Sequence, residues 1–174
     1  MLKPEIVDGV KVFTLWATQM QWEVSPGVLK EAMAYNGQVP GPELRVRLGD
    51  RVRIILQNQM DQPTMLHLHG MTLPNAVGGV PYITQDPVMP GSYCQYEFTV
   101  QDPPGMFVYH SRFNSTEQVG SGLNGAVIVE PARGRWPYPA LEVNETDGSV
   151  IDAAAPRIDV ESTLSWVTGR SASC

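Results

Sequence analysis

Apolar and polar residues alternate along most of this 174-residue chain, with a period of two. In residues 44–48 three apolar side chains alternate with two arginines, and the same alternation returns in residues 51–57. Side chains two positions apart lie on the same face of a strand, so this pattern predicts strands with one buried face. The chain is therefore expected to be an all-β protein.

Further strand-like segments are bounded by turn signals rich in proline and glycine. They are residues 10–23, 28–35, 64–71, 93–100, 106–111 and 125–129. About eight strands at this spacing predict a single Greek-key sandwich or barrel. Residues 115–119 predict a short helical turn, with Ser115 as its cap and Gln118 three residues further on.

Composition fits one domain with a sizeable core, because 43% of the residues are hydrophobic. The net charge is −6, and no cluster of Lys and Arg interleaves with aromatics, which argues against nucleic acid or an anionic membrane as a partner. No apolar run approaches the roughly 18 residues of a membrane span, and the first residues lack the pattern of a signal peptide. The two cysteines are too few for a disulfide framework.

The chain has three histidines, and all of them fall in two short strand-like segments. His67 and His69 share one strand face, and His110 lies on another predicted strand. Imidazole is the commonest nitrogen ligand for copper and zinc, so such a set can converge on one ion. A lone histidine is more often an ordinary core or surface residue, but three of three in this layout favour a metal site.

Several motifs, taken in order, resemble the first cupredoxin domain of the bacterial multicopper oxidases, the laccase-like enzymes. They lie at residues 35–42, 48–52, 67–70, 90–92, 105–111 and 125–131. The resemblance covers roughly residues 9–131. It implies a cupredoxin domain over residues 1–131 and copper as the cofactor.

The first domain of these enzymes supplies half of a trinuclear copper cluster through two His-x-His motifs. By position, His67 matches the type 2 copper ligand, and His69 and His110 match ligands of one type 3 copper. Arg112 stands where the fourth histidine is expected. Because a guanidinium stays protonated and offers no lone pair, Arg112 is expected to be a neighbouring cation that opposes a second metal ion.

Two further positions depart from the family pattern. Gly78 replaces an aspartate that is thought to assist proton delivery to oxygen, and no histidine remains for a blue-copper site, which needs a Cys and two His. Cys94 is in phase with apolar neighbours and is expected to fill the core. Met65 and Met106 share faces with the histidines but are also expected to pack in the core.

After Pro131 the alternation of apolar and polar residues becomes weak, and residues 132–174 are interpreted as a C-terminal extension that is partly ordered. Trp136, Tyr138 and Trp166 favour some burial there. The resemblance places the start of a second domain in this region, and residues 157–164 are expected to be a vestige of its first strand.

Three functions remain open. The leading hypothesis is a single-domain copper-binding protein that holds one ion per chain. The second is an oxidoreductase whose copper cluster forms between the subunits of a homo-oligomer, supplied by a small reductant or an electron-donor protein. The third is a metal-free structural relic. The resemblance suggests a location outside the cytoplasm.

Overall fold

The computed structural model describes residues 1–78, 80–83 and 85–132, and the backbone of two short strands beyond them. These two strands, β10 (Leu141–Val143) and β11 (Val150–Asp152), pair antiparallel. The predicted strand at 157–164 and the aromatic residues Trp136, Tyr138 and Trp166 lie outside the described residues. The boundary between a domain at 1–131 and an extension at 132–174 stays a prediction.

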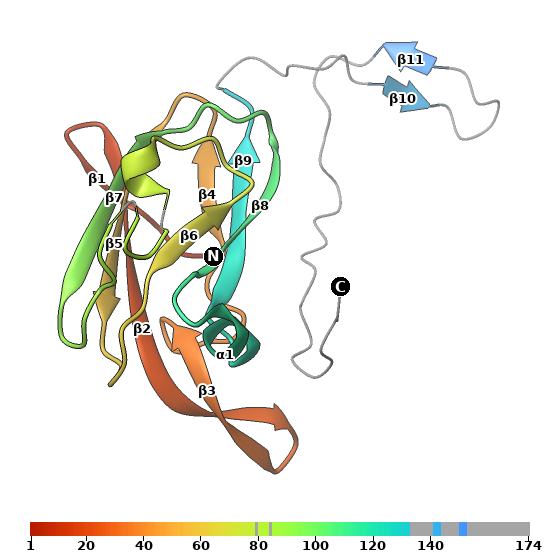
Figure 1. The fold of residues 1–174 in the computed structure, drawn as a ribbon. Helices are drawn as coiled ribbons and strands as arrows, with labels where there is room; N and C mark the ends of the chain where they lie inside the picture. Colours follow the sequence, from red (N-terminus) through yellow and green to blue (C-terminus); the bar gives the residue numbers. More distant parts are fainter. Residues whose placement is uncertain (79, 84, 133–140, 144–149, 153–174) are drawn as a thin grey trace.

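Nine strands form two sheets that face each other (Figure 1). The five-stranded sheet has the order β1 (Glu5–Val7), β2 (Val10–Ser25), β5 (Arg51–Asn58) and β7 (Tyr93–Thr99), and β3 (Val28–Tyr35) pairs with the second half of β2. The four-stranded sheet has the order β4 (Leu44–Arg47), β9 (Asn124–Glu130), β8 (Gly105–Ser111) and β6 (Leu66–His69).

The strand pairing is mixed. β2 runs parallel to β5, and β4 runs parallel to β9, whereas the other pairs in the two sheets are antiparallel. A parallel pair needs a crossover connection, so the chain passes repeatedly between the two sheets. The all-β prediction is confirmed, and every predicted strand within the described residues is present. β1 was not predicted, because three residues are too few to show a period.

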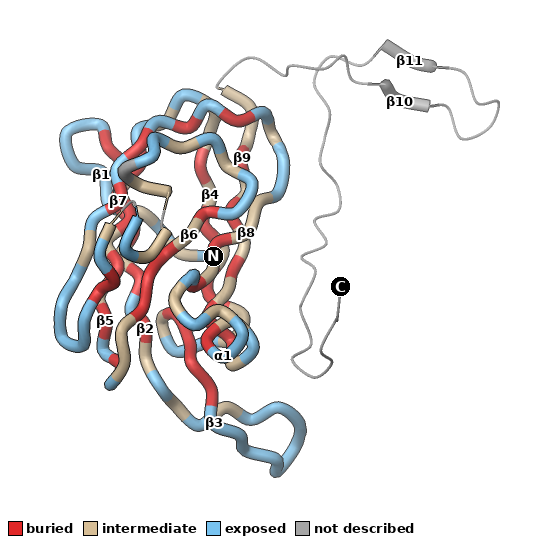
Figure 2. The backbone as a smooth tube through the Cα atoms, in the orientation of Figure 1, coloured by how far each residue is buried: buried red, intermediate tan, exposed pale blue. Residues whose placement is uncertain are grey.

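The core lies between the sheets and takes side chains from both. Figure 2 shows buried positions along the strands of each sheet. Buried and less buried residues alternate along β5 and β9, as the sequence pattern requires. Each large apolar side chain buried there contributes about 1.5–3 kcal/mol of transfer free energy. Core residues contributed by both sheets include Phe13, Ile54, Leu56, Tyr96, Val46, Leu68, Tyr109 and Val127.

In the part of the chain that the structure describes, helical structure is limited to α1 (Ser115–Gly120) and the 3-10 turn η1 (Asn75–Val77). The short helix was predicted, but its predicted cap is wrong. Asn114 precedes the helix in the left-handed region, at φ 44°, and its side chain makes no capping hydrogen bond. Gln118 does not serve the helix start either, because its side chain is buried inside the protein. Within the described residues, no helix is long and apolar enough to cross a membrane.

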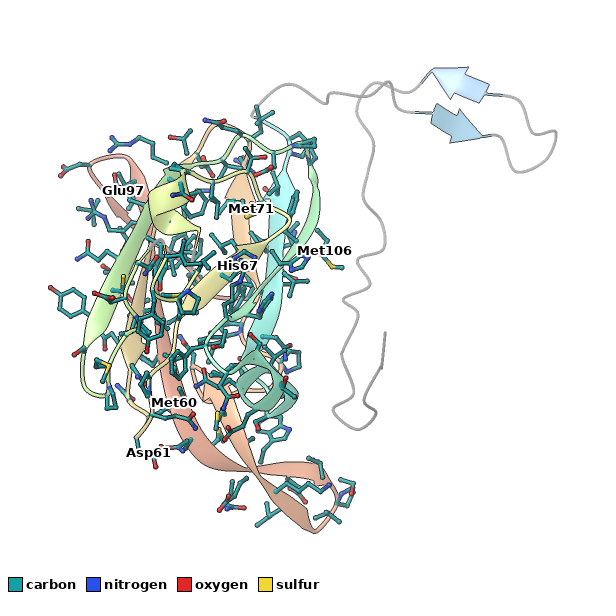
Figure 3. The ribbon with its side chains drawn as sticks, in the orientation of Figure 1. Met60, Asp61, His67, Met71, Glu97 and Met106 are labelled. Atoms are coloured by element: carbon teal, nitrogen blue, oxygen red, sulfur yellow. The ribbon has the colours of Figure 1, made fainter. Side chains whose placement is uncertain are left out.

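Three sulfur-bearing side chains differ in burial. Met65 is fully buried, as predicted, and Cys94 is half-buried on β7, where it packs against the core. The prediction for Met106 is wrong, because this residue is 47% exposed. Phe107 packs against the core, and so Met106 lies on the outer face of β8 and points away from the molecule (Figure 3).

Candidate metal centre

The three histidines lie on the outer face of the four-stranded sheet. On β6, Leu66 and Leu68 are buried. His67 and His69 alternate with them and therefore face outward. β6 is the edge strand and pairs antiparallel with β8, where His110 is the direct cross-strand partner of His67. Two predicted strands far apart in the sequence therefore bring all three imidazoles together.

The imidazole rings form a compact triangle. Their centroids are 5.3 Å apart for His67 and His110, 5.5 Å for His69 and His110, and 5.7 Å for His67 and His69. One ring nitrogen from each residue lies within 4.8 Å of the other two. Ligand nitrogens on one ion stand about 2.0–2.1 Å from a metal such as zinc, hence up to about 4.2 Å apart, so side-chain shifts of less than about 1 Å close the set.

Backbone carbonyls orient two of the three rings. His67 Nδ1 lies 2.8 Å from the carbonyl oxygen of Gly78, and His110 Nδ1 lies 2.7 Å from that of Ser111. A carbonyl can only accept, so Nδ1 carries the proton in both rings and Nε2 keeps its lone pair. This is the arrangement in which proteins present histidine to a metal. His110 Nε2 is 3.4 Å from His69 Nδ1.

The protein also favours the neutral form of these two side chains. Burial lowers the pKa of His67, opposed by the hydrogen bond to Gly78 and assisted by the charge of Arg112. Burial likewise lowers the pKa of His110, against the hydrogen bond to Ser111. A metal binds the deprotonated nitrogen, so both shifts prepare the site for an ion at neutral pH.

Arg112 follows β8 and continues its pairing with the segment before β6. Its backbone N–H donates to the carbonyl oxygen of Met65 at 3.2 Å, and its side chain is exposed. The positive charge of the guanidinium lowers the pKa of both His67 and His110. The same charge acts against any second cation bound beside the three imidazoles.

The donor set fits copper. Nitrogen ligands from imidazole suit copper as well as zinc, and the orienting carbonyls leave lone pairs free. Within the described residues, this is the one group of three or more His, Cys, Asp or Glu side chains close enough to hold an ion. Cys94 belongs to β7 of the other sheet, where its sulfur accepts a hydrogen bond from Gln85 Nε2 at 3.3 Å.

The sequence did not reveal the groups that orient the histidine rings. The carbonyl oxygens of Gly78 and Ser111 are backbone atoms, and no pattern of side chains indicates their role. Gly78 attracted notice only for the aspartate it replaces, and Gln118 was assigned to the helix start.

Comparisons with known proteins agree with this geometry. Residues 16–134 match the family described as multicopper oxidase. The chain is 35% identical over 120 residues to an iron transport multicopper oxidase of Kluyveromyces lactis. The aligned region covers 67% of the chain and 19% of the relative. It is 34% identical over 128 residues to a copper resistance protein A homolog of Pseudomonas syringae pv. tomato, which covers 74% of the chain and 21% of the relative.

A solved structure shows the same fold. The multicopper oxidase of Pseudomonas thermotolerans is 43% identical, with a TM-score of 0.68, over 70% of this chain and 30% of that one. The chain spans about a fifth of the length of the two curated relatives described above.

Proposed function

Because this chain belongs to the multicopper oxidase family, for which copper is the cofactor, we propose that it binds one copper ion through His67, His69 and His110. The observation that supports this most strongly is the convergence of one nitrogen from each imidazole within 4.8 Å. When bound, copper supplies one-electron oxidation and reduction. The protein contributes ligand orientation, through Gly78 and Ser111, and neutral imidazoles.

The proposal limits the chain to one ion. A second copper would need further ligands beside the three imidazoles, and Arg112 follows the end of β8 close enough for its charge to act on His67 and His110. Its guanidinium has no lone pair and repels a cation. The three histidines also differ in their contacts, because His69 and His110 approach each other at 3.4 Å whereas His67 is held by the loop at Gly78.

Equilibrium dialysis with copper, followed by metal analysis, tests this function. We expect about one copper per chain in the parent protein. His69→Ala and His110→Ala should lower the affinity by more than the 10–100-fold that loss of an outer hydrogen-bond partner typically causes. His67→Ala should lower it less.

Val108→Ala is the matched control, because Val108 is the cross-strand partner of His69 and lies on the same sheet face. It should bind copper like the parent. Parent-like copper uptake by all three histidine variants would place the site elsewhere. Absence of uptake by the parent would favour the metal-free relic.

A second candidate is an oxidoreductase whose copper cluster forms between subunits. Two observations favour it: His69 is exposed, and it lies on the edge strand of its sheet. Beside it the outer face of β8 and β9 carries Val108, Ala126 and Ile128, which are only half-buried. A second copy packed there would bring further ligands and cover this apolar face. A small reductant or an electron-donor protein would then supply electrons.

Sedimentation and oxygen uptake distinguish the two candidates. A copper-binding module stays monomeric and consumes no oxygen with a phenolic or metal-ion reductant. The intersubunit enzyme sediments as an oligomer, and its oxygen consumption rises with bound copper and is lost in His110→Ala.

A further inference from the structure

The side chain of Gln118 is buried at one end of the paired strands that carry the histidines, where the segment before β6 meets the last residue of β8. Gln118 belongs to α1, which lies below the Leu66 end of β6 and the Ser111 end of β8 (Figure 1). Its side chain is fully shielded from solvent, as are those of Thr64 and Ser111. A buried amide is costly unless its hydrogen bonds are made, so these contacts must be accounted for.

Every hydrogen-bonding group of the Gln118 amide has a partner. Its Oε1 accepts from Ser111 Oγ at 2.6 Å and from Thr64 Oγ1 at 2.8 Å. Its Nε2 donates to the carbonyl oxygen of Pro63 at 2.8 Å and to Gln62 Oε1 at 3.2 Å. An amide has two donors and an acceptor oxygen with two lone pairs, so the capacity of this side chain is filled.

These partners belong to both ligand strands. Residues 62–64 form the segment that leads into β6, and Thr64 lies three positions before His67. Ser111 is the last residue of β8, and its carbonyl oxygen accepts the proton of His110 Nδ1. One amide therefore ties the start of β6 to the residue that orients the His110 ring.

The other hydrogen bonds at this junction are longer. Ser111 N donates to the carbonyl oxygen of Leu123 at 3.1 Å, Phe113 N donates to Ser111 Oγ at 3.2 Å, and the hydroxyls of Thr64 and Ser111 lie 3.3 Å apart. The peptide that joins Ser111 to Arg112 is anchored toward β6 by the bond from Arg112 N to Met65 O, which is long at 3.2 Å. The Ser111 hydroxyl lies at 3.2 Å from the carbonyl oxygen of Phe113, further than from Gln118. The shortest contact of the Ser111 side chain is thus the one to Gln118.

We propose that Gln118 is a positioning residue for the metal centre: its buried amide fixes Ser111 against the segment entering β6, and so fixes the tautomer and orientation of the His110 imidazole. The inference deepens the proposed copper site and rests on it. Gln118 touches no ligand nitrogen and acts through Ser111. Groups that hydrogen-bond to a metal ligand tune the metal affinity, because they hold the ligand in the orientation that makes the bond.

The first test uses the metal-free chain and so does not depend on copper binding. Gln118→Met keeps the length of the side chain and removes the amide. Nitrogen-15 NMR of the imidazoles should show His110 protonated at Nδ1 in the parent and a mixture of tautomers in Gln118→Met. Gln118→Glu keeps an oxygen that accepts from Thr64 and Ser111, and it should restore part of the parent spectrum.

Asn58→Leu is the matched control. Asn58 is 1% exposed, and its amide donates to the carbonyl oxygens of Gln62 and Val88 at 2.8 Å each, but it does not contact Ser111. This variant should lose thermal stability as Gln118→Met does, yet keep the parent His110 spectrum. The same spectral change in Asn58→Leu would show that general loosening is responsible, and would overturn the proposal.

The second test measures copper. Gln118→Met should bind copper(II) at least tenfold more weakly than the parent, with a broadened electron paramagnetic resonance spectrum, whereas Asn58→Leu should match the parent. If Gln118→Met does not fold, Ser111→Ala, which keeps the carbonyl oxygen, should show the same changes. A parent-like tautomer in the folded variant overturns the proposal. A parent that binds no copper overturns the proposed function and leaves the tautomer test to decide the role of Gln118.

Discussion

Arg112 and Cys94 are the two residues whose chemistry most restricts what the metal centre can do. Arg112 stands two positions after His110 and so shares its face, and its charge acts on two of the imidazoles. Cys94 carries the one described thiol, and it belongs to the opposite sheet. The first residue opposes a second ion beside the three imidazoles, and the second lies on the wrong sheet to give the bound copper a thiolate ligand.

Replacing Arg112 with histidine should raise copper uptake above one ion per chain. The variant supplies a fourth imidazole on the face of His110 and removes a fixed positive charge. Equilibrium dialysis and metal analysis measure the ratio of copper to protein. Arg112→Gln is the control, because it removes the charge and adds no comparable ligand. A second copper in Arg112→Gln would show that charge alone had prevented its binding.

The copper(II) form of the parent should be pale. Blue copper sites owe their colour to a copper–thiolate bond, whereas Cys94 lies on the other sheet, where its sulfur accepts a hydrogen bond from Gln85. Absorption and electron paramagnetic resonance spectra should therefore be those of a type 2 centre, and Cys94→Ser should leave them unchanged. An intense blue product that is lost in Cys94→Ser would contradict the assignment of Cys94 to the edge of the core.

At the scale of elements, close packing against β9 fixes the position of β8, the strand that carries His110. Tyr109, next to His110, is fully buried and donates its hydroxyl proton to the carbonyl oxygen of Pro42 at 2.7 Å. Its ring lies directly over Gly125, on the neighbouring strand β9. A Cβ atom at Gly125 would stand 2.3 Å from the Tyr109 ring. The absence of a side chain at this position is what lets the two strands pair with the tyrosine between the sheets.

Gly125→Ala should therefore destabilise the protein by about 1–3 kcal/mol or more, because overpacking forces the ring or the strand to move. Thermal and denaturant unfolding measure the loss. Copper affinity should fall as well, since a displaced Tyr109 moves the adjacent His110. Gly120→Ala is the control: a Cβ there meets nothing within 4 Å, so stability should change little. Equal stability of the two variants would mean that Tyr109 can relax freely.

At the scale of the whole molecule, the candidate metal centre lies on the outer face of one sheet rather than inside the sandwich. None of the three histidines belongs to the core that the two sheets form. The site is built from an edge strand and its neighbour, which makes it open to solvent on one side. Copper should therefore act on a preformed structure and add to its stability by mass action.

Saturation with copper should raise the melting temperature. At a free copper concentration of 100 times the dissociation constant, binding adds about 2.7 kcal/mol, which for a chain of this size corresponds to about 5–10 °C. Differential scanning calorimetry with and without a chelator measures the shift. His110→Ala should show little or none of it. A shift of the same size in His110→Ala would indicate that copper stabilises the protein at another place.

The strands and the histidine positions followed from the sequence by itself. The period of two along β5 and β9 reflects burial of one face, which is a local property that the order of residues displays directly. The convergence of His67, His69 and His110 was expected for the same reason. The sequence also excluded a fourth imidazole at Arg112, because side-chain chemistry does not depend on the fold.

Only the tertiary structure decided which atoms support the site. The face of β8 that packs against the core decides the exposure of Met106, and the contacts of α1 with the ends of β6 and β8 bury Gln118. The carbonyl oxygens of Gly78 and Ser111 have no signature in the sequence. Every residue has a carbonyl group, and only its position in space makes it a partner. The sequence therefore determined the strands and the positions of the histidines on them. Long-range packing decided the register of the strands and the backbone carbonyls that orient the His67 and His110 rings.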